Sequence, residues 1–187
     1  MPSLYIIGGA NGSGKTTVSM SLLPNFLDCF EYVNADAIAA GLSPLNPESM
    51  AMEAGRLMIT RLRTLSNSGS DFAFETTLAA RTFAPFIIEC KAKGYIINLI
   101  YFWLQSADLA VERVAQRVAS GGHSIPEDVI RRRYQRGRAN LISLYLPLCD
   151  RWIIYNNSSS DASLVAEYSD SQQFIVYESR IWNQIRG

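Results

Sequence analysis

The chain has 187 residues, is 48% hydrophobic and carries no net charge, so it is long enough for one compact domain and too neutral to favour nucleic acid or an anionic membrane. Its 17 basic residues include 14 arginines, whose planar guanidinium group suits phosphate. Cys29, Cys90 and Cys149 lie far apart, which excludes a disulfide framework and a zinc motif. No basic leader precedes the first apolar run, and the longest apolar run, 95–104, is too short to span a bilayer. We therefore expect a cytoplasmic protein with reduced, partly buried thiols.

The first predicted elements are a strand at residues 4–7 and a helix that begins near residue 17, separated by the sequence G-A-N-G-S-G-K-T. This sequence fits the phosphate-binding P-loop pattern G-x-x-x-x-G-K-T in its strand–loop–helix context. The backbone N–H groups of the loop and the helix N-terminus attract phosphate oxygens. Lys15 is expected to contact the β- and γ-phosphates of ATP, and the Thr16 hydroxyl to ligate Mg²⁺. The predicted nucleotide-binding residues are Gly9, Ala10, Asn11, Gly12, Ser13, Gly14, Lys15, Thr16 and Thr17.

An acid follows the second predicted strand, 30–33, in the sequence V-N-A-D-A. The carboxyl ends of strands in such sheets face the ligand crevice. Asp36 could therefore accept the proton of an attacking hydroxyl, or hold Mg²⁺ through water. The alternative is that Asn34 caps the next helix and Asp36 only favours its dipole, and both interpretations can hold together.

A helix is predicted from Pro47 to Leu65, and a strand at 72–74 leads into a second acid, Glu75. An acid at this place can orient the Mg²⁺ shell or a substrate hydroxyl. The alternative is a helix-capping network of Glu75, Thr76 and Thr77. Arg81 could bind a substrate phosphate or be solvated.

The next strand is predicted at 95–104, and Ser106 can cap the helix after it. Gly121 and Gly122 should end that helix, and Ser124 to Glu127 fits a capping box for another helix, which should run to about Leu146.

These two predicted helices carry most of the arginines that could bind phosphate. Seven arginines lie between residues 113 and 138, with only Glu127 and Asp128 to oppose them. A helix, a glycine hinge and an Arg-rich helix could form a lid, residues 117–138, over a triphosphate. Some of the seven must face solvent. We expect Arg117 and Arg132 to be catalytic, followed by Arg136; the full set is Arg113, Arg117, Arg131, Arg132, Arg133, Arg136 and Arg138.

Two polar segments remain open to interpretation. His123, the only histidine, lies in the hinge and could donate to a phosphate or a sugar hydroxyl, or be solvated. The loop from Asn156 to Asp161 could border the nucleotide base or be a surface turn.

The alternation of strands and helices, completed by a strand at 152–155, predicts an α/β fold with a mainly parallel sheet. Residues 174–177 could add a last strand, and the tail a short helix. We expect residues 1–187 to form a single domain with a three-layer α/β/α architecture.

The P-loop, N-A-D at 34–36, F-E-T-T at 74–77 and G-G-H-S-I-P at 121–126 together resemble the zeta-toxin family of small P-loop kinases. The resemblance covers residues 3–158. It implies a five-stranded kinase core with strand order 2-3-1-4-5, the use of ATP with Mg²⁺, and phosphorylation of a sugar-nucleotide hydroxyl, such as that of UDP-N-acetylglucosamine. It also raises the prospect of an antitoxin partner.

The resemblance implies roles for individual residues. Lys15 and Thr16 take the phosphate and Mg²⁺ roles, Asp36 the base role, and Arg117 a γ-phosphate role. Glu75 takes a substrate-binding role, which we extend to Thr76, Arg81 and His123. The second lid arginine of the family is missing at Gly122 and His123, so Arg132 or Arg136 would have to substitute.

Other functions fit these motifs less well. A kinase of a nucleoside, a sugar or another metabolite would share the same core. A transporter-type ATPase would need an apolar strand ending in Asp-Glu, and a GTP switch would need N-K-x-D and D-x-x-G. The sequence contains none of these three signatures.

Overall fold

The parallel part of the central sheet follows the order expected from the sequence. The computed structural model describes residues 1–122, 124–169 and 172–187. Strand β1 (Ser3–Gly9) pairs with β3 (Phe72–Thr76) and β4 (Ile96–Trp103), β2 (Tyr32–Val33) pairs with β3, and β5 (Arg151–Asn156) pairs with β4, all in parallel. The order of these five strands is β2-β3-β1-β4-β5, which confirms the predicted order.

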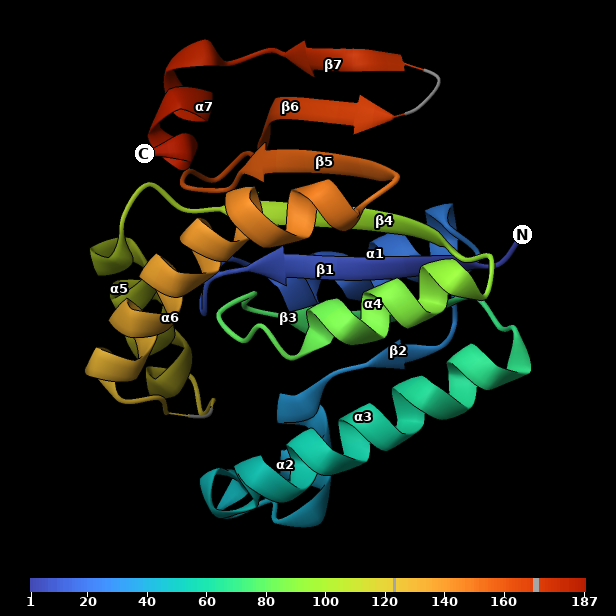
Figure 1. Ribbon diagram of the computed structural model, residues 1–187. Coiled ribbons are helices and arrows are strands. Elements are labelled where there is room, and N and C mark those ends of the chain that lie inside the picture. The colour runs from blue at the N-terminus through green and yellow to red at the C-terminus, as the bar shows by residue number, and fades with distance from the viewer. Residues whose placement is uncertain (123, 170–171) are drawn as a thin grey trace.

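The sheet continues beyond the five expected strands. Strands β6 (Ser163–Ser169) and β7 (Gln172–Val176) extend it in antiparallel pairing to seven strands, so the expectation of a five-stranded sheet was wrong (Figure 1). The segment of β6 mixes Leu164 and Val165 with Glu167 and two serines, and so lacks the apolar run that marked the inner strands. The expected last strand is β7, and the tail forms the short helix α7 (Ser179–Arg186).

Helices cover both faces of the sheet, which gives the expected three layers (Figure 1). The larger apolar core packs helices α3 (Ala51–Ser68) and α4 (Phe83–Ala92) and the segment 141–148 on one face, whereas α1 (Lys15–Phe26) covers the other through Leu23. The helices that complete the chain are α1 (Lys15–Phe26), α2 (Ala35–Leu42), η1 (Pro47–Met50), α3 (Ala51–Ser68), α4 (Phe83–Ala92), α5 (Ala107–Ala119) and α6 (Glu127–Asn140).

The predicted helix boundaries had mixed success. The Ser106 side chain accepts a hydrogen bond from the Leu109 amide and caps α5, and Gly121, with φ of 88°, follows its end, both as predicted. The capping box at Ser124 was wrong, because α6 begins at Glu127 after Pro126 with no side-chain cap. After α6 the helical path continues as a π-helical turn, η2 (Leu141–Tyr145), and a 3₁₀ turn, η3 (Leu146–Leu148), close to the expected end.

The three cysteines are free, as expected, and all three are buried, whereas partial burial was expected. Burial raises the pKa of the Cys29 thiol to about 11 and that of Cys149 to about 12. Within residues 1–122, 124–169 and 172–187, no helix combines the length and the apolar character needed to cross a membrane.

Candidate active site

The P-loop joins β1 to α1. Its shape depends on glycines, because any larger residue in their place would force neighbouring atoms to shift. Gly12 and Gly14 have φ of 76° and 84°, in the left-handed region that glycine adopts most readily. A Cβ atom at Gly12 would lie 3.0 Å from the carbonyl oxygen of Ala110, and one at Gly14 would lie 2.8 Å from Nδ2 of Asn157. The loop is therefore held between α5 and the β5–β6 connection.

This connection supports the P-loop directly. Nδ2 of Asn157 donates to the carbonyl oxygen of Ser13 at 2.8 Å. Arg113 in turn donates to the carbonyl oxygens of Asn157 at 2.7 Å and Ser158 at 3.1 Å. The polar loop after β5, which the sequence left open between a base-binding loop and a surface turn, therefore braces the phosphate loop.

The loop holds two buried polar side-chain atoms without a partner among the described residues, and only the Ser13 hydroxyl is a donor. Asn11 Oδ1 and Ser13 Oγ are buried, and in the part of the chain that the structure describes neither has a hydrogen-bond partner. Buried polar atoms nearly always have one. The Ser13 hydroxyl and the amides at the N-terminus of α1 fit an anionic group such as the phosphates of a nucleotide.

Lys15 lies inside this cradle, only 5% exposed. Its Nζ donates to the carbonyl oxygen of Ala10 at 2.8 Å and lies 3.7 Å from Oε1 of Glu75. Burial lowers the pKa of the Lys15 amine, and the charges of Glu75 and Asp36 oppose that shift. The amine is thus placed where a phosphate oxygen could replace the carbonyl.

Glu75, at the carboxyl end of β3, is the centre of a hydrogen-bond network. Its Oε2 accepts from the Thr16 hydroxyl at 2.8 Å, from Asn34 Nδ2 at 3.2 Å and from the Tyr32 hydroxyl. Burial, and then the charge of Glu75, raise the pKa of Tyr32, so its hydroxyl stays protonated and donates. Tyr32 was missed by the sequence analysis, because a tyrosine in a strand is typical of the core.

The oxygens of Thr16 and Glu75 could hold Mg²⁺ together with phosphate oxygens. Among the described residues, no three His, Cys, Asp or Glu side chains form a group that could bind a metal by themselves. Mg²⁺ is commonly held by one or two protein oxygens, waters and substrate phosphates, so these residues fit the ion.

The structure assigns the cap of α2 to Asn34 and leaves the Asp36 carboxylate for another use. Asn34 Oδ1 accepts from the amides of Asp36 at 2.8 Å and Ala37 at 3.3 Å, which confirms the predicted cap. Asp36 lines the pocket, and its side chain makes no hydrogen bond within the described ranges.

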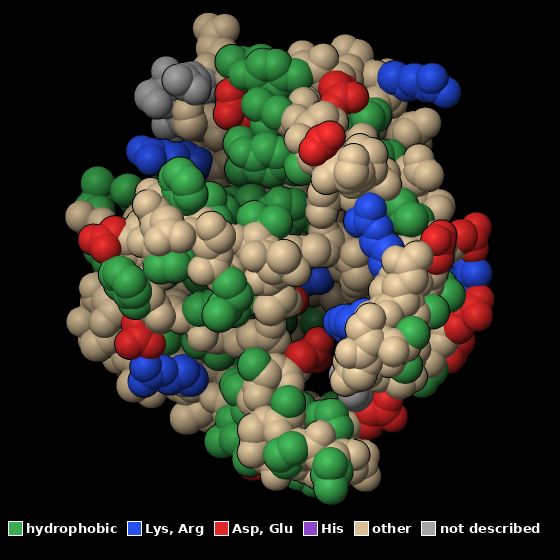
Figure 2. All heavy atoms as spheres, turned by 180° about the vertical axis from the view of Figure 1, so that it is seen from behind, with side chains coloured by type: hydrophobic (Ala, Val, Ile, Leu, Met, Phe, Trp, Pro, Cys, Tyr) green, Lys and Arg blue, Asp and Glu red, His purple; other side chains and the backbone are tan. Residues whose placement is uncertain are grey.

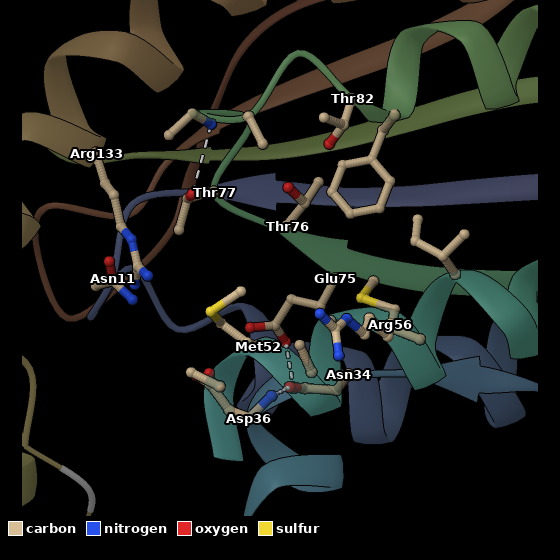
Figure 3. A pocket seen from close by; sticks show the side chains of 18 of the residues that line it. Asn11, Asn34, Asp36, Met52, Arg56, Glu75, Thr76, Thr77, Thr82 and Arg133 are labelled. Atoms are coloured by element: carbon tan, nitrogen blue, oxygen red, sulfur yellow. Dashed lines mark hydrogen bonds between the residues drawn. The ribbon is translucent and has the colours of Figure 1, made fainter. Parts of the chain in front are cut away.

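A pocket of about 1060 Å³ opens beside the P-loop. Seen from behind, the molecule is hollowed near its middle, and acidic and basic side chains both lie around the hollow (Figure 2). The pocket walls come from the start of α2, from α3 with Met52 and Arg56, from the end of β3 with Thr76, from the β3–α4 loop with Thr77, and from α6 (Figure 3).

The alternative of a helix-capping network at Thr76 and Thr77 was wrong. Their hydroxyls accept from the amides of Leu78 at 3.1 Å and Ala79 at 3.5 Å, whereas α4 begins only at Phe83. The two threonines therefore shape a turn at the edge of the pocket.

Three of the seven arginines support the structure. Arg131 pairs with Asp108 at 2.6 Å and Glu127 at 2.8 Å. Arg138 donates to the carbonyl oxygen of Gln184 at 3.0 Å, and Arg113 braces the P-loop as described above.

Three others, Arg132, Arg133 and Arg136, line the pocket. Arg132 lies 3.6 Å from Asp128, whereas Arg133 and Arg136 have no ion pair in residues 1–122, 124–169 and 172–187. Arg133 extends from α6 into the pocket on the side of Asn11 (Figure 3). Arg133 was not singled out from the sequence, since spacing alone does not distinguish it from its neighbours.

The remaining predicted residues lie apart from these walls. The charge of Arg117 acts on Lys15, although Arg117 is not among the pocket-lining residues. Arg81 is exposed and does not line the pocket, and its charge acts on Tyr145. His123 lies outside the described residues, and the roles assigned to all of these side chains stay predictions.

Comparisons with known proteins place this site in a family. The profile of the family described as Zeta toxin matches residues 1–167. A protein of Haemophilus influenzae (strain ATCC 51907 / DSM 11121 / KW20 / Rd), described as an uncharacterized protein, is 32% identical over 128 residues, which are 67% of this chain and 88% of that protein.

Two solved structures share the fold. The crystal structure of AvrRxo1-ORF1:AvrRxo1-ORF2 with sulphate ions has a TM-score of 0.81 at 16% identity and covers 100% of this chain, which spans only 64% of the other chain's length. A structure of the PezAT chromosomal toxin–antitoxin system of Streptococcus pneumoniae has a TM-score of 0.73 at 17% identity and covers 98% of this chain and 77% of that chain. The chain therefore belongs to the zeta toxin family and has the P-loop kinase fold of that family.

Proposed function

We propose that the protein is an ATP-dependent kinase that transfers the γ-phosphoryl group of ATP to a hydroxyl of a sugar nucleotide, with UDP-N-acetylglucosamine as the first acceptor to test. The observation that carries the proposal is the convergence of Lys15, Glu75 and the Asp36 carboxylate where the P-loop meets the pocket. An acceptor hydroxyl in that pocket would lie beside both a base and a bound phosphate chain. A structure of AvrRxo1-ORF1:-ORF2 with ATP, which has a TM-score of 0.79 at 17% identity and covers 100% of this chain and 64% of that chain, supports ATP as the donor.

In this mechanism Asp36 accepts the proton of the acceptor hydroxyl as its oxygen attacks the γ-phosphorus. The bond from that phosphorus to the bridging oxygen breaks, and ADP leaves with the electron pair. Lys15 binds phosphate oxygens throughout, and the pocket arginines Arg133 and Arg136 stabilise negative charge on the transferred group. Arg117 and Arg132 are the further candidates for this role.

Thr16 and Glu75 would hold Mg²⁺ at the phosphates, where the ion neutralises phosphate charge. The Thr16 hydroxyl, which donates to Glu75 Oε2 at 2.8 Å, would serve as one of the two protein oxygens of the ion. Tyr32 and Asn34 orient Glu75, because both donate to its Oε2. Thr76 at the pocket edge contributes to acceptor binding.

We further propose an antitoxin protein as a partner. The support is the PezAT toxin–antitoxin system and the two-component AvrRxo1 complex among the structures that share the fold. Co-expression with the neighbouring open reading frames, followed by co-purification, tests this proposal.

The function is tested by incubating the full chain with ATP–Mg²⁺ and a panel of nucleotide sugars, nucleosides and free sugars, read by mass spectrometry for the gain of one phosphate. We expect the gain on UDP-N-acetylglucosamine or a related sugar nucleotide. A gain only on a nucleoside or a free sugar would instead make the protein a metabolite kinase. ATP hydrolysis with no acceptor phosphorylated would contradict the kinase function.

A further inference from the structure

Helix α6 carries the arginine wall of the pocket and is fastened to neighbouring elements along its whole length. Near its start, Ile130 is 2% exposed and packs in a cluster with Ala10 and Val114. In its middle, the Tyr134 hydroxyl donates to the carbonyl oxygen of Leu104, at the end of β4, at 2.7 Å. These contacts hold the helix against the strand ends.

The C-terminal part of α6 holds an adjoining wall of the pocket, the loop 77–82. Gly137 is buried, and a Cβ atom there would overlap the carbonyl oxygen of Thr77. Asn140 Nδ2 donates to the carbonyl oxygens of Leu78 at 2.9 Å and Ala79 at 3.2 Å. One turn later, the hydroxyl of the fully buried Tyr145 donates to the carbonyl oxygen of Ala80. Four consecutive carbonyl groups of the loop are thus contacted from one helical segment.

The loop needs such support because its backbone is unusual. Leu78 has φ of 59°, a left-handed conformation that residues with a Cβ atom rarely adopt. Its side chain is fully buried, and its amide donates to the Thr76 hydroxyl. A conformation of this kind persists only where its surroundings determine it.

We propose that Gly137, Asn140 and Tyr145 are positioning residues that join α6 and loop 77–82 into one rigid unit. Arg133 and Arg136 then reach a bound ligand by rotation of their side chains. Helix α6 does not swing about Gly121 and Gly122, as the lid predicted from the sequence would require. The identification of this unit as an acceptor site rests on the proposed function, whereas its rigidity does not.

The rigidity is tested without any acceptor, by amide hydrogen exchange of the full chain read by mass spectrometry. Asn140→Asp keeps the shape of the side chain but turns a carboxylate toward two carbonyl oxygens, and Tyr145→Phe removes one donor. We expect exchange in residues 77–82 to rise about tenfold or more in Asn140→Asp and by less in Tyr145→Phe. The matched control is Asn25→Asp, at an exposed position of α1 where the described residues offer the side chain no hydrogen bond.

If residues 77–82 of Asn140→Asp exchange their amide hydrogens at the wild-type rate, the proposal is overturned. Nucleotide-induced separation of α6 from the core, measured as the distance between spin labels at Gln135→Cys and Glu89→Cys, would also overturn it. The native thiols are buried and would not compete for the labels. In a protein whose nucleotide binding has been confirmed by calorimetry, we expect this distance to stay the same with and without ATP–Mg²⁺.

A kinetic measurement separates positioning from a general structural role. With ATP and UDP-N-acetylglucosamine, we expect Gly137→Ala and Asn140→Asp to raise KM for the acceptor several-fold and to leave KM for ATP unchanged. Gly41→Ala, where a Cβ meets nothing within 4 Å, is the matched control for Gly137→Ala. Equal rises in both KM values would contradict the proposal. If no acceptor is phosphorylated, the proposed function fails while the exchange experiment still decides the rigidity.

Discussion

The two ends of the site are built in different ways. At the phosphate end, a short stretch of backbone forms the cradle, two glycines with positive φ shape it, and Asn157 and Arg113 brace it from outside. At the acceptor end, side chains from α2, α3, α6 and the β3–α4 loop surround a pocket of about 1060 Å³, and Arg133 and Arg136 have no ion pair among the described residues.

The difference follows from what each end has to recognise. The triphosphate chain is the same in every nucleoside triphosphate, so a rigid backbone cradle suits it. An acceptor differs between members of a fold class, and pockets for varied ligands are assembled from side chains. Loss of the cradle's own cation, Lys15, should therefore nearly abolish function, whereas single substitutions of the side chains around the pocket should lower it by smaller factors.

The largest effect is expected for Lys15→Ala. The buried amine is the cation closest to the phosphate cradle, so its loss should lower turnover by about 10³-fold or more and weaken ATP binding. Calorimetry with ATP–Mg²⁺ and a turnover assay measure both effects. Lys93→Ala, which removes a surface lysine bound to Ser66 and Asn67, is the matched control and should keep normal turnover.

Asp36→Asn should have the next largest effect, at the junction of the two ends. The amide keeps the size of the side chain but cannot accept the proton, so turnover should fall by about 10²-fold or more. Thermal stability should change little, because Asn34 caps α2. Asp108→Asn, at the same position in the first turn of α5, is the control, and near-normal turnover in Asp36→Asn would make that carboxylate structural.

Arg133→Ala and Arg136→Ala should each lower kcat by about tenfold and raise KM for ATP by less. The reason is that charge on the transferred group is stabilised mainly in the transition state. Arg133→Lys should rescue only in part, since lysine lacks the bidentate fork. Arg138→Ala, on the same helix but bonded to Gln184, should keep turnover. A uniform small loss at all three positions would indicate a diffuse electrostatic effect.

The smallest effect is expected for Asn157→Ala, which leaves the P-loop sequence intact and removes only its brace. Loss of one hydrogen bond to Ser13 should raise KM for ATP by about fivefold with kcat little changed. Steady-state kinetics at varied ATP measure it. An unchanged KM would show that the glycines alone determine the loop.

Parts of the protein that depend on local contacts could be predicted from its sequence, and parts that depend on distant contacts could not. The β1–P-loop–α1 unit and the Asn34 cap depend on neighbours within a few residues, and local patterns reveal them. The Tyr32–Glu75 bond joins residues 43 positions apart, and Asn140 and Leu78 are 62 apart. Contacts at such distances arise from packing, which a single sequence does not display.

The arginines illustrate the same limit. All seven were visible as a basic cluster, but only packing separates Arg131, which is paired with two acids, from Arg133, which lines the pocket. Strand β6 was missed for a related reason, since its polar residues suit a strand near the sheet edge and lack an apolar run.

The central claim, transfer between the two ends, is tested most directly with ATP that carries heavy oxygen in its γ-phosphoryl group. The wild-type chain, Lys15→Ala and Asp36→Asn are incubated with this ATP, Mg²⁺ and the accepted sugar nucleotide, and products are weighed by mass spectrometry. We expect the acceptor to gain one labelled phosphate with the wild-type chain and almost none with either variant. Label found only in inorganic phosphate, or equal transfer by all three proteins, would contradict the account.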